Sequence, residues 1–151
     1  MAPSAAERGA ANLLRGCARA QPGERLLIAT EPAELGYFDA RVASCVAATA
    51  RTLGLAVDVT DVGFEPHDPH LSDALLARIG EADIVLFLAR LGDQLRFSDM
   101  PAGKRIVVSF ALREELLASP FATADYAAFL EIKAAADAAL AQAREMRLTC
   151  P

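Results

Sequence analysis

Short apolar runs alternate with longer segments of helical periodicity along this chain, and that alternation restricts its fold more than any other feature. The apolar residues of each run are largely consecutive, which is typical of strands buried on both faces of a parallel sheet. The helical segments between them can serve as the crossover connections that parallel strands need. The runs that we predict to be strands are residues 25–30, 55–62, 83–88, 105–110 and 146–150.

The order of these elements predicts the fold class. We expect an α/β domain with a doubly wound, mainly parallel sheet of about five strands and helices on both faces, Rossmann-like or flavodoxin-like. A capping box, Ser4 followed three residues later by Glu7, marks the start of the first helix. The later helices are predicted at residues 37–53, 71–79, 112–117 and 123–144.

The apolar side chains of these elements should form one core. The last helix carries only a thin apolar stripe, and if a second domain follows, this stripe should face it. The stripe consists of Tyr126, Phe129, Leu130 and Leu140. The side chains that we expect to be almost wholly buried are Leu27, Val57, Val85, Leu86 and Val107, flanked by Leu13, Val46 and Leu130.

Length and charge limit the domain count and the partners. With 151 residues, the chain should form a single α/β domain over residues 1–151. The net charge is −5 and the basic residues are scattered, so we expect no nucleic-acid partner. No apolar run approaches the roughly 20 residues of a membrane span, so we expect no membrane partner. Three widely spaced cysteines and the lack of a secretory leader pattern indicate a cytoplasmic protein.

Polar residues follow the strands at the edge of the sheet where doubly wound folds bind ligands. Solvated loop ends are the simpler interpretation of these residues. After the third strand, Arg90/Asp93 and Arg96/Asp99 pairs could brace the loop, or the two guanidiniums and Gln94 could hold a carboxylate or the backbone of another domain. The residues that we select for ligand or interdomain contact are Thr30, Glu31, Arg90, Asp93, Gln94 and Arg96.

No complete catalytic motif is present. The turn at residues 30–36 lacks the glycine pattern of dinucleotide-binding loops, and the sequence contains no P-loop. Ser109 follows a strand without the glycine turn of a nucleophile elbow. Cys17 and Cys45 fall on helix stripes that we predict to be buried, where they would act as small apolar residues. We therefore expect no catalytic residue in this chain.

The two histidines, His67 and His70, are weak candidates for metal ligands. Together with Glu65 and Asp68 they supply side-chain types that bind zinc. Two prolines restrict the same loop, however, and no helix places both rings on one face. We interpret the segment as a proline-braced surface loop and expect no cofactor in this chain.

Several short stretches, taken in order, resemble one known family. They are Leu14-x-x-Cys17, the run from Pro22 to Ile28, Gly54 before the second strand, Ala82-Asp83-Ile84-Val85, and Met146-Arg147-Leu148-Thr149. Their order is similar to that in the amino-terminal domain of the thermophilic-type leucyl aminopeptidases, which are two-domain cocatalytic metallopeptidases. The dihydroxypyridine dioxygenases share that architecture. The resemblance covers essentially the whole chain.

The resemblance implies that this chain is the non-catalytic amino-terminal domain of a longer, aminopeptidase-like hydrolase. The family's metal ligands lie in the carboxy-terminal domain, so zinc, cobalt or manganese is expected there and this chain alone should be inactive. Its own carboxy-terminal domain would be its partner, and homo-oligomerisation stays open. Two alternatives also stay open: the same module from a dihydroxypyridine-dioxygenase-like enzyme, and a freestanding domain that binds a ligand or partner. Reading the gene beyond Cys150 would separate them.

Overall fold

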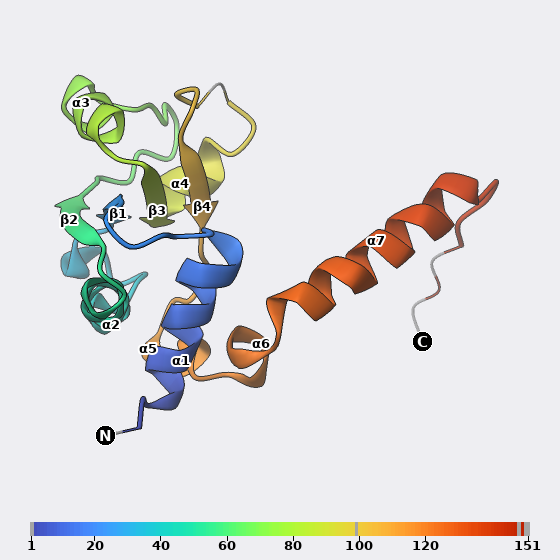
Figure 1. The fold of residues 1–151 in the computed structure, drawn as a ribbon. Coiled ribbons are helices and arrows are strands. Elements are labelled where there is room, and N and C mark those ends of the chain that lie inside the picture. The colour runs from blue at the N-terminus through green and yellow to red at the C-terminus, as the bar shows by residue number, and fades with distance from the viewer. Residues whose placement is uncertain (1, 99, 148, 150–151) are drawn as a thin grey trace.

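Four parallel strands form the centre of the structure, a computed structural model that describes residues 2–98, 100–147 and 149. They are β1 (Arg25–Thr30), β2 (Ala56–Asp61), β3 (Ile84–Leu88) and β4 (Arg105–Val108), in the spatial order β2-β1-β3-β4. Every neighbouring pair is parallel. Helices cover both faces of this sheet (Figure 1). The predicted α/β, Rossmann-like fold is confirmed, with four strands rather than five among the described residues.

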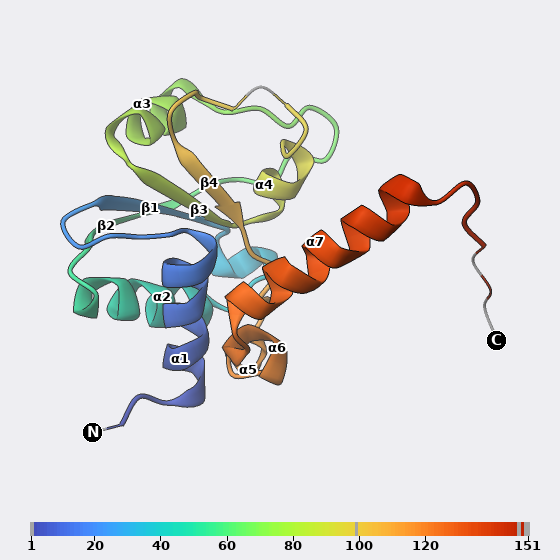
Figure 2. The same ribbon diagram turned by 45° about the vertical axis from the view of Figure 1, so that its right-hand side comes forward.

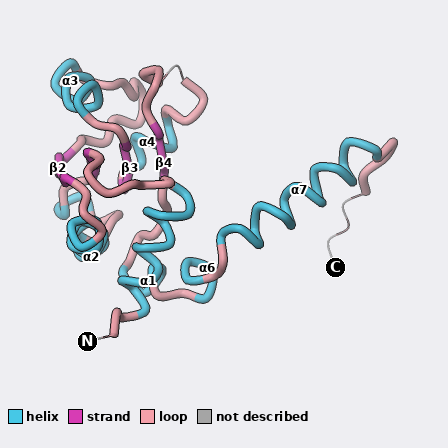
Figure 3. Tube along the Cα trace, viewed as in Figure 1, coloured by secondary structure: helices cyan, strands magenta, loops and turns pink. Residues whose placement is uncertain are grey.

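Polar caps set the starts of several helices. Glu7 N donates to Ser4 Oγ at 3.2 Å and Ser4 N donates to the Glu7 carboxylate at 2.6 Å, which is the predicted capping box. Ser119 and Asp125 cap two further helices, so the single helix expected at residues 123–144 is divided (Figure 3). The helices are α1 (Ala5–Asn12), α2 (Ala40–Thr52), α3 (Asp73–Glu81), α4 (Arg90–Gln94), α5 (Glu114–Leu117), α6 (Pro120–Thr123) and α7 (Tyr126–Gln142).

Two irregular helical turns complete these elements. A π-helical turn extends α1 over Leu13–Cys17, and a 3₁₀ turn at Ala33–Leu35 follows β1. Within the described residues, no helix combines the length and apolar composition required to cross a membrane.

The predicted fifth strand at residues 146–150 is wrong for the part of it that the structure describes. Met146, Arg147 and Thr149 are not in a strand, while Leu148 and Cys150 lie outside the described residues. Helix α7 points away from the sheet and carries the residues after it away from β4 (Figures 1 and 2). A strand needs a neighbouring strand for its backbone hydrogen bonds, and α7 does not return the chain to the sheet edge.

Two apolar clusters fill the space on the two faces of the sheet. On one face, Leu86 belongs to a cluster with Leu14 beside α1, Val46 of α2 and Leu117 of α5. On the other face, residues of β1 and β3 belong to a cluster with α3 and α4. The side chains of β3 alternate between these clusters, and all of its residues are buried. A strand buried on both faces explains why its sequence is continuously apolar.

Burial agrees with the prediction at the centre of the sheet and departs from it elsewhere. The side chains that are at most 1% exposed, as predicted, are Leu27, Val46, Val85 and Leu86. The side chains that are only half-buried are Val57 and Val107, on the edge strands, and Leu13. Leu130 is 41% exposed because α7 leaves the body of the domain. The prediction of two buried cysteines is also wrong, since Cys17 is exposed and Cys45 half-buried.

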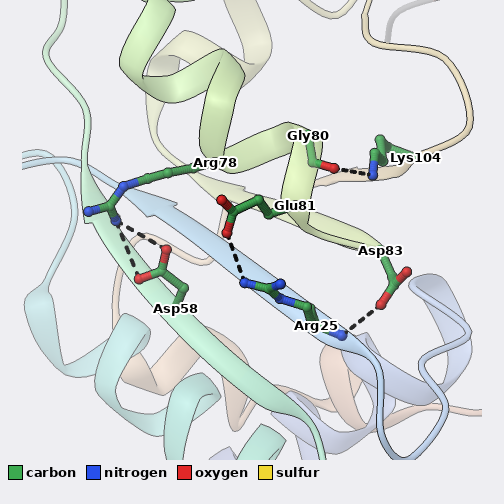
Figure 4. A network of polar contacts seen from close by, with 7 residues as sticks. All are labelled: Arg25, Asp58, Arg78, Gly80, Glu81, Asp83 and Lys104. Carbon is green, nitrogen blue, oxygen red and sulfur yellow. Dashed lines mark hydrogen bonds and ion pairs between the residues drawn. The ribbon is translucent and has the colours of Figure 1, made fainter.

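Polar contacts connect α3 to strands β1 and β2 and to the loop between β3 and β4 (Figure 4). Arg78 Nη1 lies 3.1 Å from the Asp58 carboxylate, and Arg25 Nη2 lies 2.9 Å from the Glu81 carboxylate. Lys104 Nζ donates to Gly80 O at 2.8 Å. These groups are exposed, and such surface pairs contribute little to stability, about 0–1 kcal/mol each. We interpret this network as structural.

Two helix glycines have opposite surroundings and give a matched pair of predictions. A Cβ on Gly9 of α1 would lie 1.8 Å from Leu117 O, so Gly9→Ala must push α1 and α5 apart and should cost about 1–3 kcal/mol. A Cβ on Gly80 of α3 would meet nothing within 4 Å, so Gly80→Ala should stabilise the domain by roughly 0.4–1 kcal/mol. Urea titration of the free energy of unfolding measures both. Equal stability of the two variants would contradict the close approach of α1 and α5.

Candidate functional site

The candidate site lies beyond the carboxyl ends of β1 and β3. These strands are neighbours at the centre of the sheet, and the chain leaves them in opposite directions, from β1 to β2 and from β3 to β4. Such a reversal is the topological switch point at which open α/β sheets form a ligand-binding crevice. Glu31 directly follows β1, and Arg90 begins α4 two residues after β3.

An ion pair between Glu31 and Arg90 occupies this position. Arg90 Nη2 lies 2.7 Å from Glu31 Oε2, and Arg90 Nε donates to the same carboxylate at 3.0 and 3.1 Å. The backbone N of Arg90 also donates to Glu31 Oε1, at 2.5 Å. The Glu31 side chain is 0% exposed and that of Arg90 is 24% exposed. Hydrogen bonding to Glu31 stabilises the charged guanidinium and raises the pKa of Arg90.

Two aromatic rings from different loops contact the same guanidinium. Arg90 Cζ lies 3.5 Å from the ring centroid of Phe64, in the loop after β2, and 4.5 Å from that of Tyr37, in the loop after β1. The negative faces of aromatic rings attract a cation, by about 0.5–2 kcal/mol depending on its desolvation. Arg90 therefore connects the loops that follow β1, β2 and β3, and its charge is already matched within the chain.

The remaining predicted site residues stabilise the same edge without converging on Arg90. Gln94 Nε2 donates to Glu65 O at 2.9 Å, which joins α4 to the loop after β2. Asp93 pairs with Arg96 at 3.0 Å and not with Arg90, so the expected Arg90/Asp93 pair is wrong. The expected Arg96/Asp99 pair involves Asp99, which lies outside the described residues. Thr30 is buried at the end of β1, where its carbonyl accepts a hydrogen bond from Val62 N at 2.8 Å.

His67 and His70 lie in an exposed loop, as expected from its two prolines. The His70 ring is anchored by a contact of 2.9 Å between its Nδ1 and Asp68 O, and His67 N donates to the Glu65 carboxylate at 3.2 Å. A cleft of about 400 Å³ with a mixed polar and apolar lining lies between the end of β2 and α3 and includes His70 and Glu65. In the described part of the chain, no three His, Cys, Asp or Glu side chains are grouped as metal ligands.

An apolar groove that the sequence analysis missed lies between β4, α1, α5, α6 and the start of α7. It has a volume of about 730 Å³, and Ser109 and Cys17 also line it. Ser109 Oγ accepts a hydrogen bond from Ala111 N at 3.3 Å, which is a turn contact. Although Cys17 is exposed as a residue, partial desolvation of its thiol raises the pKa of that thiol and so disfavours the thiolate. The apolar side chains that define this groove are Leu13, Phe110, Leu116, Phe121, Tyr126 and Phe129.

Comparisons with known proteins find similarity to this chain only among solved structures. No protein-family model matches it, and no curated protein matches it in sequence. The 2,5-dihydroxypyridine dioxygenase of Pseudomonas putida KT2440 superposes with a TM-score of 0.46 and 14% identity over 70% of this chain. A fatty acid ABC transporter substrate-binding protein from Thermomonospora curvata does so with a TM-score of 0.45 and 21% identity over 79% of this chain. This chain matches about a third of the length of each, 33% and 31%.

Proposed function

We propose that this chain is a non-catalytic α/β domain of an aminopeptidase-like metalloenzyme and shapes access to a metal site carried by another domain. The observation that supports the non-catalytic role is the Glu31–Arg90 pair at the switch point. In related architectures this crevice receives a ligand, whereas here a buried carboxylate, a guanidinium and two aromatic rings fill it. The assignment to an aminopeptidase-like enzyme rests on the resemblance in sequence.

The contacts of Arg90 with Glu31, Tyr37 and Phe64 would also help this edge of the sheet to serve as an interface for a neighbouring domain. Loops are ordinarily the most mobile parts of an α/β domain, and an interface formed by them loses conformational entropy on contact. Arg90 holds three of these loops in one arrangement before any contact is made. A second domain that carries the metal would then meet a preformed surface. The two histidines of this chain lie in one exposed loop and do not form a cocatalytic site, which needs two metals about 3.5–4 Å apart.

A second candidate function is a freestanding domain that binds a partner. Helix α7, none of whose residues is buried, offers apolar side chains to a partner, although the same exposed stripe is also what the first candidate expects to face a neighbouring domain. The two candidates differ in what the gene encodes after residue 151. A Gly-Thr-Asp stretch followed by glutamate and histidine ligands would support the first candidate, and a stop codon would support the second.

The purified chain is expected to show no aminopeptidase activity. Its described residues include no group of three or more His, Cys, Asp or Glu side chains that could hold a metal ion, so leucyl and other aminoacyl reporters should not be hydrolysed when Zn²⁺, Co²⁺ or Mn²⁺ is added. The measurement is reporter release over a range of metal concentrations. The matched control is the His67→Ala/His70→Ala double variant. Metal-dependent turnover that disappears in this variant would overturn the proposal and place the active site in this domain.

A further inference from the structure

Helix α7 extends from the body of the domain with its apolar side chains uncovered. Figure 2 shows the helix projecting from the domain, and none of its 17 residues is buried. Ile132 is 65% exposed and Leu140 is 55% exposed. Isolated helices shorter than about 12–15 residues are marginal in water, and helices of this length in proteins are stabilised mainly by packing. Only the first turns of α7 contact the domain, where the rings of Phe129 and Phe121 lie 5.1 Å apart, and the rest of the helix lacks packing partners among the described residues.

The larger side chains on one face of α7 follow a heptad pattern. Leu130, Lys133, Asp137 and Leu140 are separated by three, four and three residues, which is the spacing of the a and d positions in a coiled coil. Lys133 and Asp137 form an ion pair within the helix. Most of the residues between them are alanines, which would allow a second helix to approach closely. This face, which we name the α7 seam, combines two leucines at its ends with two opposite charges at its centre.

The α7 seam is symmetric about Ala135. Leu130 and Leu140 lie five residues on either side of Ala135, and Lys133 and Asp137 lie two residues on either side. An antiparallel second copy related by a twofold axis at Ala135 would place each leucine against the other leucine and each lysine against the other aspartate. A parallel copy would place lysine against lysine and aspartate against aspartate, which is repulsive. The charges thus select both the partner and its direction.

We propose that two copies of this chain associate through antiparallel contact of their α7 seams. The central Lys133 and Asp137 of each copy then form intermolecular ion pairs that fix the register, in the way that polar residues at core positions specify register in coiled coils. The two leucine layers bury apolar surface on either side. The interface is isologous, as is usual for dimers with twofold symmetry.

The apolar groove overlaps the α7 seam, because the seam residues Leu130 and Lys133 also line the groove. Tyr126 and Phe129 of α7 belong to both the groove and the first turns of the helix. In the antiparallel arrangement, the end of the second copy's α7 lies beside these turns. Residues 143–147, which follow that end, are not in a helix or strand, and Met146 among them is 70% exposed. The symmetric contact would cover Leu130 and Leu140 and lie beside the apolar groove, whose lining residues Phe110 and Phe121 are 52% and 76% exposed, whereas Ile132 lies on another side of α7.

The proposal is independent of the function proposed above, because it requires neither a second domain nor a metal. It is tested by sedimentation velocity on the purified chain over a range of protein concentrations. The unaltered chain should form a dimer. Lys133→Asp and Asp137→Lys, each alone, place like charges against each other at the centre of the seam and should weaken dimerisation on the order of a hundredfold or more.

Mixing the two variants separates contacts between copies from contacts within the helix. Each single variant loses its internal Lys133–Asp137 pair, and mixing cannot restore that pair. An equimolar mixture opposes lysines of one chain to aspartates of the other and should recover a heterodimer. The matched control is Glu131→Lys, the same type of charge reversal on the opposite side of α7, which should leave the dimer unchanged. A monomeric unaltered chain, or a mixture of variants that stays monomeric, would overturn the proposal.

Discussion

Val85→Asp should prevent the domain from folding at neutral pH. Val85 is 0% exposed at the centre of β3, paired in register with Leu27 of β1 and Ile106 of β4. Its side chain belongs to the cluster shared with Ile79 of α3. The variant would place a carboxylate among apolar side chains that offer it no hydrogen-bond donor. An unpaired buried polar group costs several kcal/mol, against a total stability of about 5–15 kcal/mol for an ordinary domain.

The matched control is Val59→Asp on the edge strand β2. Val59 is 41% exposed, so the same carboxylate stays in contact with water there, and the change should cost no more than about 1 kcal/mol. Far-UV circular dichroism and urea titration measure both variants. A Val85→Asp chain with the melting temperature of the unaltered protein would show that the placement of β3 at the centre of the sheet is wrong.

Arg90→Met should destabilise the domain by roughly 3–5 kcal/mol, because it leaves the buried Glu31 carboxylate without its counter-charge. The double variant Glu31→Gln/Arg90→Met removes both charges. Its glutamine oxygen can still accept the hydrogen bond that Glu31 Oε1 receives from the backbone N of residue 90. We therefore expect the double variant to be more stable than Arg90→Met alone. Chemical denaturation of the unaltered chain, the two single variants and the double variant completes a double-mutant cycle and gives the coupling free energy of the Glu31–Arg90 pair.

The result of this cycle decides how the switch point is interpreted. A large coupling free energy is expected for a pair that acts as a structural connection between loops. Arg90→Met with unchanged stability would mean that Glu31 is accessible to water or to a ligand, and the crevice would then be open rather than filled. That outcome would remove the observation on which the proposed non-catalytic role depends.

The central strands could be predicted because burial on both faces of the sheet leaves a recognisable apolar pattern in their sequence. The residues of β3 are apolar without interruption, and a strand covered on both faces requires this. Residues 146–150 contain Arg147 and Thr149 between apolar residues, so they lack that uninterrupted apolar signal, and their described part forms no strand. Leu130 was expected in the core because it lies on an apolar stripe, but a stripe does not specify which surface it meets. The direction of α7 follows from the turn between α6 and α7, which local periodicity does not describe.

The sequence could predict several residues of the site, but not which of them contact one another. Glu31 and Arg90 were both selected from their positions after β1 and β3, although Asp93 was named as the partner of Arg90. Glu31 and Arg90 are 59 residues apart, so no local sequence pattern indicates that they form a pair. Arg90 is the first residue of α4, so its backbone N and its side chain both meet the end of β1, whereas Asp93 lies nearly one turn further along the helix. Tyr37, which is adjacent to Phe38, and Phe64 lie in loops, and no local pattern indicates that their rings contact Arg90.

The contacts of Arg90 have a consequence for the motions of the domain. Three loops that would otherwise fluctuate separately share one guanidinium, through Glu31, Tyr37 and Phe64. Opening any one of them exposes the charge or the ring that it contributes and weakens the contacts of the other two. The carboxyl edge of the sheet therefore behaves as one cooperative unit of local unfolding, with a single opening free energy in place of three.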